Sequence, residues 1–96
     1  MAMKSRWLKS ALQQLDQEAD FIAENNPKAA IDFVAQVVRQ TELLKSHPQL
    51  GRSGRVLGTR ELIIHGYLYL IPYRIRENTV ELLRVFHTAR QYPPKK

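Results

Sequence analysis

Residues 48–58 read Pro-Gln-Leu-Gly-Arg-Ser-Gly-Arg-Val-Leu-Gly, and the spacing of apolar residues changes across this stretch. It holds three of the four glycines of the chain and two arginines, a composition typical of a loop. Before it, apolar residues recur every three or four positions, as on one face of a helix. After it, they form short runs rich in Ile, Val, Leu and Tyr, as in strands. The stretch therefore separates a helical half from a sheet half and predicts an α+β fold.

The helical half divides into two helices. The first carries its apolar face on Leu8, Ala11, Leu12, Leu15, Ala19 and Ile22. Asn25-Asn26-Pro27 interrupts the pattern, because Asn26 can cap a new helix and Pro27 suits its first position. The second helix carries a stripe of Ile31, Val34, Val38, Thr41 and Leu44, which Phe33 and Val37 widen, and ends near 46–48. So short a connection favours an antiparallel hairpin of helices.

The sheet half contains three extended runs: Thr59–Ile64, Tyr67–Ile75 and Thr79–Phe86. Turn residues separate them, His65-Gly66 first and 76–78 second. With a short strand within Ala2–Trp7, they predict a mainly antiparallel sheet of about four strands that receives the helix hairpin on one face. Pro72 lies inside the middle run and has no N–H to donate, so we expect a bulge or a locally unpaired stretch there.

Size and composition limit the class of protein. Ninety-six residues suit a single domain spanning 1–96, with 91–96 as a tail. The chain has no Cys, and its three histidines lack close ligand spacing, so we expect no disulfide, metal site or cofactor. The longest apolar stretch is shorter than the roughly 20 residues that span a bilayer, and no secretory signal pattern opens the chain. These features predict a cytoplasmic protein without a membrane partner.

The net charge of +6 is the first indication of function. A small basic domain attracts phosphate backbones, anionic surfaces or an acidic protein. Arg52, Arg55, Arg60, Arg74 and Arg90 are candidates for binding phosphate or a protein target. The alternative interpretation is a basic surface that only favours solubility.

Three stretches and their order resemble the toxins of the RelE/ParE superfamily. "GRSGRVLGTREL" leads into the first long strand, "YLIPYRI" lies in the next, and "VELLRVFHTARQYP" ends the chain. The resemblance covers nearly the whole chain and is closer to the ParE-type plasmid-stabilisation branch. It implies the toxin of a type II toxin-antitoxin pair, held inactive in a hetero-oligomer with a cognate antitoxin. The positive charge fits an acidic antitoxin segment.

The resemblance implies one of two activities. RelE-like toxins cut messenger RNA on the ribosome, whereas ParE-like toxins inhibit DNA gyrase. Metal-independent RNA cleavage needs a base, an acid and cations at the phosphate. His87, Arg90 and Tyr92, with Arg60 or Arg74 at the phosphate, are the candidates for these roles.

One position weighs against the nuclease. RelE-like toxins carry an Arg early in the strand that resembles "YLIPYRI", and here that position is Leu70. Arg74 lies four residues later, roughly 13 Å along a strand, which is too far for the same role. We therefore expect a ParE-like gyrase inhibitor first and a RelE-like ribosome-dependent mRNA endonuclease second. A third reading is a non-toxic basic adaptor or nucleic-acid-binding domain.

Overall fold

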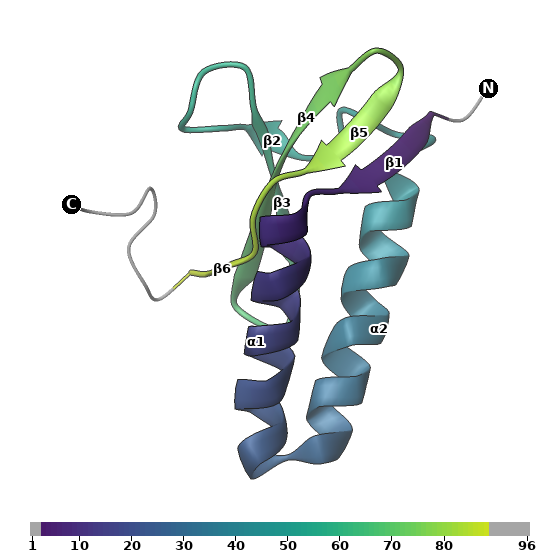
Figure 1. Ribbon diagram of the computed structural model, residues 1–96. Coiled ribbons are helices and arrows are strands. Elements are labelled where there is room, and N and C mark those ends of the chain that lie inside the picture. Colours follow the sequence, from purple (N-terminus) through teal and green to yellow (C-terminus); the bar gives the residue numbers. More distant parts are fainter. Residues whose placement is uncertain (1–2, 89–96) are drawn as a thin grey trace.

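The computed structural model describes residues 3–88 of the chain (Figure 1). The elements are, in order, β1 (Lys4–Trp7), α1 (Lys9–Asn25), α2 (Pro27–Leu43), β2 (Arg52–Ser53), β3 (Arg60–Ile64), β4 (Tyr69–Arg76), β5 (Thr79–Leu82) and β6 (Phe86–His87). The two helices lie side by side as a hairpin, and the end that joins them extends beyond the strands (Figure 1). The predicted α+β fold with a short first strand is confirmed.

The junction of the helices forms as the sequence predicts. The side-chain oxygen of Asn26 accepts a hydrogen bond of 3.0 Å from the backbone N–H of Ala29, and Pro27 follows at the first helical position. The backbone N–H of Asn26 also donates to the carbonyl of Ile22, which closes the end of α1. One residue therefore ends the first helix and begins the second, which sets the tight reversal of the chain.

The buried face of α2 differs from the predicted stripe. Ala30, Phe33, Val37 and Thr41 are buried, whereas Ile31 is 70% exposed and Val38 is 49% exposed. Two apolar stripes overlap on this helix, and spacing alone does not decide which of them meets the sheet. The ring of Phe33 decides it by packing against Tyr69 and Tyr67, with centroids 4.7 and 5.5 Å away.

The sheet has the strand order β1-β5-β4-β3-β2. β1 pairs with β5 in parallel, and the other pairs are antiparallel. It contains six strands rather than about four because β2, a two-residue strand, forms within the loop and the expected strand 79–86 divides into β5 and β6. Both of these strands pair with β4, which lies in the middle of the sheet.

The division of the last strand occurs opposite Pro72. β5 pairs with Tyr73–Arg76, and β6 pairs with 69–70. Between β5 and β6, the Leu83 N–H donates to the Pro72 carbonyl at 2.9 Å, whereas the Val85 N–H donates to the Gln14 side chain on α1 at 2.9 Å. Since proline has no N–H, a continuous ladder is not possible on both sides of it. The expected unpaired stretch at Pro72 is confirmed.

The core lies between the helix hairpin and one face of the sheet. Its fully buried members include Phe33, Leu44, Ile64, Tyr73 and Leu82. Alternate strand residues point to the opposite face, which we call the outer face. The outer face includes Arg6, Glu61, Leu70, Pro72, Arg74 and Glu81. Of the described candidate site residues, Arg52 and Arg74 lie on this face and Arg55 lies in the loop beside it. Arg60 and His87 are instead register partners of the inward-facing Tyr73 and Tyr69.

Candidate functional site

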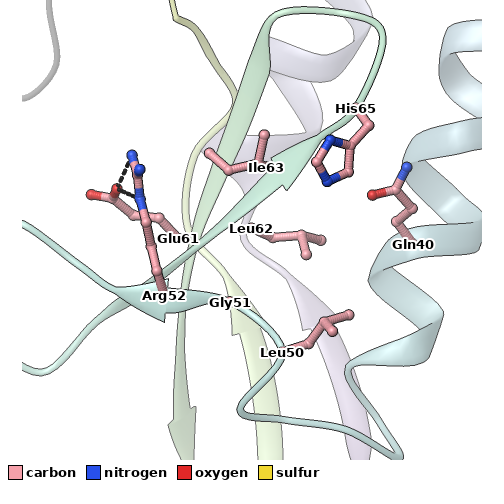
Figure 2. A pocket seen from close by; sticks show the side chains of 8 residues that line it. All are labelled: Gln40, Leu50, Gly51, Arg52, Glu61, Leu62, Ile63 and His65. Atoms are coloured by element: carbon pink, nitrogen blue, oxygen red, sulfur yellow. Dashed lines mark hydrogen bonds and ion pairs between the residues drawn. The ribbon is translucent and has the colours of Figure 1, made fainter.

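A buried carboxylate organises the loop between β2 and β3. Glu61 is the second residue of β3, lies on the outer face and is 1% exposed. Arg52 donates to one of its oxygens through Nε at 3.2 Å, with a second guanidinium nitrogen at 3.1 Å (Figure 2). The backbone N–H of Arg55 donates to the other oxygen at 3.0 Å. A buried charge is tolerated only when it is paired, so Arg52 neutralises Glu61 and both fix the loop.

Arg60 holds the segment that enters the loop. Its guanidinium donates to the carbonyls of Gly51 at 2.6 Å and Gln49 at 3.5 Å. The Tyr73 hydroxyl donates to the Pro48 carbonyl at 2.7 Å and accepts from Gly51 N–H at 2.9 Å. Burial raises the pKa of Tyr73 above 10.0, against the smaller opposing effects of Gly51 and Arg60. Arg60 therefore fixes the backbone of the segment that enters the loop.

A second carboxylate anchors the outer face near β1. Glu81 on β5 is 4% exposed, and Arg74 Nε donates to it at 2.6 Å, while Arg6 lies 3.8 Å away. The hydrogen bond from Arg74 holds the pKa of Glu81 below its ordinary value of 4.5, although burial opposes the shift, and the charges of Arg6 and Arg76 contribute further. Arg74 therefore joins β4 to β5 through this ion pair.

The structure separates His87 from the described arginines that a nuclease would use. His87 on β6 is the register partner of Tyr69, and their rings meet edge to face with centroids 5.0 Å apart. Arg74 lies five positions from Tyr69 on β4, roughly 17 Å along a strand, and Arg60 pairs with Tyr73 four positions away, roughly 13 Å. Arg90 and Tyr92 lie outside the described residues.

Leu70 occupies the position where the resemblance places a nuclease arginine. It lies on the outer face opposite Phe86 and is 2% exposed. An apolar side chain there provides no hydrogen-bond donor for a phosphate, and its neighbour Phe86 provides none either. Arg60 and Arg74, the two described cations considered for the phosphate, therefore lie too far from the register position of His87 to act with it in metal-independent RNA cleavage.

The β3 edge is open beyond the short β2 strand. β2 pairs only with Arg60 and Glu61, so residues 62–64 continue past the end of their neighbour. A hollow of about 290 Å³ lies beside this edge, with Leu50, Leu62, Gln40 and His65 among its lining residues (Figure 2). An open edge of this kind can pair with an extended segment of another chain.

The helix hairpin carries a larger apolar hollow. Its volume is about 630 Å³, and its lining residues are Ala19, Asp20, Ala23, Pro27, Ala30, Ile31, Val34 and Ala35. Its small side chains allow close approach, and Ile31 is largely exposed at its border. The sequence pattern placed Ile31 in the buried stripe, and its exposure instead leaves this groove open on the hairpin. The alternation of Ala with exposed Ile and Val on α2 is the signal that could have indicated it.

Sequence analysis also missed the roles of Glu61 and Glu81. Each stands next to apolar residues inside a strand, a position where a carboxylate is buried and needs a partner. That signal indicates that each carboxylate needs a cationic partner, a role that the sequence analysis did not consider for Arg52 and Arg74. Within residues 3–88, no group of acidic or histidine side chains is arranged to hold a metal ion. In the same range, neither helix is both long and apolar enough to span a bilayer.

Comparison with known proteins places these features in a family. A family model described as the ParE toxin of type II toxin-antitoxin system, parDE, matches residues 5–92. A curated relative, "Putative toxin Y4kP" of Sinorhizobium fredii, is 40% identical over 88 residues and covers 92% of this chain and 91% of its own.

Solved structures share the fold. The chromosomal ParDE toxin-antitoxin system from P. aeruginosa contains a chain with a TM-score of 0.82 and 25% identity, covering 90% of this chain and 96% of its own. The RelBE2 toxin-antitoxin complex from Mycobacterium tuberculosis has a TM-score of 0.58 and 23% identity, covering 91% of this chain and 99% of its own, which shows the fold alone. The extent of the family match and the identity to the S. fredii relative place this chain in the ParE toxin family of type II toxin-antitoxin systems.

Proposed function

We propose that this toxin inhibits DNA gyrase in the cytoplasm and is neutralised by a cognate antitoxin. The positions of Leu70 and His87 favour gyrase over messenger RNA as the target. A buried leucine stands where an RNA-cleaving relative would need a cation, and the nearest described arginines of β3 and β4 lie roughly 13 to 17 Å from the register position of His87. A toxin of this kind acts by binding a protein.

The antitoxin has two places to bind. The groove between the helices can take the apolar face of an antitoxin helix, because it is lined by alanines and bordered by Ile31. The open edge of β3 at 62–64 can pair with an extended antitoxin segment. An acidic antitoxin segment would be attracted to the basic strands and loops, which gives the positive charge of the chain a role in neutralisation.

The test compares the two activities of the superfamily in purified systems. We expect the native chain to inhibit supercoiling by gyrase and to leave messenger RNA intact during translation in vitro. In cells, induction without the antitoxin should produce filaments and a DNA-damage response. The His87→Ala variant should retain full activity, because the imidazole packs on Tyr69 and its register position is far from Arg60 and Arg74.

The opposite result has a clear form. Transcripts cut only during translation, together with loss of cutting in His87→Ala and undisturbed supercoiling, would show the RelE-like endonuclease instead. Adding the purified antitoxin should restore supercoiling, and this serves as the control for a specific toxin.

A further inference from the structure

The loop between β2 and β3 presents two apolar side chains to solvent. Leu57 is 99% exposed and Val56 is 48% exposed, and they stand at the far end of the loop from the sheet. A fully exposed leucine gains none of the free energy that burial of its side chain would provide. A loop tip that served only to connect two strands would more commonly be polar. We call Val56 and Leu57 the loop tip.

Hydrogen bonds fix the conformation of the loop tip. Thr59 N–H donates to the Val56 carbonyl at 3.1 Å, and the Thr59 hydroxyl donates to the same carbonyl at 2.6 Å. Gly58 has φ of +82°, so Leu57 and Gly58 occupy the two corner positions of a turn that needs glycine second, as in type II turns. Leu57 is therefore held outward at a corner of the turn.

The base of the loop is fixed as well. Gly54 N–H donates to the Thr59 carbonyl at 2.8 Å, and a Cβ at Gly54 would lie 2.2 Å from the Thr59 hydroxyl oxygen. The buried Glu61 carboxylate holds Arg52 and the Arg55 N–H on the other side. Because the loop is already held in one conformation, it loses less conformational entropy when the tip binds, and this favours affinity.

The surroundings of the loop tip indicate the chemistry of its partner. Arg52, Arg55 and Arg60 surround the loop against the single carboxylate of Glu61, so its field is positive. Arg52 is committed to Glu61, and Arg60 donates to backbone carbonyls. A nucleic-acid interface aims such donors at phosphates, whereas here the outermost groups are apolar.

We propose that the loop tip is a docking element that inserts Leu57 into an apolar pocket on a protein whose rim carries carboxylates. This inference rests on the proposed function, which identifies the partner as gyrase, and gyrase is therefore the probe in the test. The arginines attract the acidic rim and orient the approach, and Leu57 and Val56 supply the buried contact.

The experiment compares Leu57→Ser with two controls. Leu57→Met keeps an apolar tip, and Leu68→Ser removes an exposed leucine from another turn, where Leu68 is 63% exposed. Binding of each purified variant to gyrase is measured together with growth inhibition in cells that lack the antitoxin. From the area of a buried leucine, we expect Leu57→Ser to weaken gyrase binding about 10- to 100-fold. Both controls should bind like the native chain, and all variants should keep the same thermal unfolding midpoint.

The outcomes separate the docking element from the proposed function. A native chain that inhibits gyrase, together with a Leu57→Ser variant of equal affinity and toxicity, would overturn the docking element and leave the proposed function intact. If the native chain stops growth without binding gyrase, the proposed target is wrong, and a toxicity loss confined to Leu57→Ser would still support docking. If Leu57→Ser weakens only the binding of free duplex DNA or of the antitoxin, the proposed docking element is overturned.

Discussion

Glu61 is the residue on which the conformation of the β2–β3 loop depends. Its carboxylate is buried and accepts hydrogen bonds from both the Arg52 side chain and the Arg55 N–H. Replacing it with Gln keeps the shape and one acceptor but removes the charge that Arg52 neutralises. We expect Glu61→Gln to lower the free energy of unfolding by about 1.5–3 kcal/mol, the usual contribution of a hydrogen bond to a charged group, as measured by urea denaturation.

A matched control distinguishes this effect from general loss of charge. Arg39 lies on the exposed side of α2 and donates to Gln36 of its own helix. Arg39→Gln should change the free energy of unfolding by less than about 0.5 kcal/mol, as exposed substitutions usually do. Equal stability of Glu61→Gln and the native chain would contradict the role assigned to the carboxylate.

Glu81 predicts how stability depends on pH. Its pKa is lowered in the folded chain, first by the hydrogen bond from Arg74, so the folded state favours the ionised carboxylate. The corresponding stabilisation is complete above the ordinary pKa of 4.5 and is lost as the pH falls through the lower folded value. Glu81→Gln should therefore lose stability at pH 7 but show a shallower loss below pH 4.5 in thermal unfolding measured across pH. An acid-limb slope equal to that of the native chain would contradict this linkage.

At the same scale, the sequence indicates residue types more readily than their partners. The arginines of the loop are evident, but that Arg52 and Arg74 pair with Glu61 and Glu81 depends on strand register. Register follows from pairing between segments far apart in the chain, and local spacing does not encode it. The tyrosines are similar: Tyr69 and Tyr73 are buried, but the hydrogen bond from Tyr73 to Pro48 joins segments far apart in the chain.

Among the elements, the helix hairpin depends most directly on one cap. Asn26 accepts from Ala29 N–H, and no second side chain caps α2 at this end. Asn26→Ala should cost about 1 kcal/mol of stability. For a domain of this size, that corresponds to a fall of roughly 4–8 °C in the thermal unfolding midpoint.

Asn25→Ala provides the comparison for the cap. Asn25 is the last residue of α1 and is exposed, and alanine suits a helix well. The thermal unfolding midpoint of Asn25→Ala should therefore lie within a few degrees of the native value, because substitutions at exposed positions usually change stability little. A fall in midpoint for Asn25→Ala as large as that for Asn26→Ala would show that the cap is not the cause.

The elements themselves were largely predictable from the sequence. The two helices, their junction and the turn at His65-Gly66 follow from local periodicity and from Asn, Pro and Gly chemistry. The sequence predicted an interruption at Pro72 itself, but not the break between β5 and β6, because these strands lie on another segment that pairs with β4 on either side of Pro72. The choice of the Phe33 face over the Ile31 face required the aromatic rings of the sheet.

Across the whole molecule, charge is distributed unevenly between the layers. α1 carries Asp16, Glu18, Asp20 and Glu24 against Lys9 alone. α2 is balanced, with two acids and two bases, so the positive excess belongs to the strands and loops. An acidic target is therefore attracted to the sheet side, while the helix groove relies on apolar contact.

This separation predicts that neutralisation and toxicity can be altered independently. Ile31→Gln places an amide at the border of the helix groove without disturbing the core, since Ile31 is 70% exposed. We expect it to weaken antitoxin affinity about 5- to 50-fold, as loss of one buried aliphatic contact does, while gyrase inhibition stays unchanged. Both are measured with purified components.

Leu12→Gln is the control for the helix groove. Leu12 is 47% exposed on α1 and does not line the groove, so its antitoxin affinity should match that of the native chain. Equal antitoxin affinity for Ile31→Gln and Leu12→Gln would place the antitoxin elsewhere.

The parallel pairing of β1 with β5 affects the order in which the chain can fold during synthesis. Lys4 pairs with Thr79, so the first strand must wait until the ribosome has added most of the chain. At usual elongation rates of about 5–20 residues per second, that delay is roughly 4–15 s. During this interval the nascent toxin lacks the edge that closes its sheet, and an antitoxin already present has time to meet the chain before it is complete.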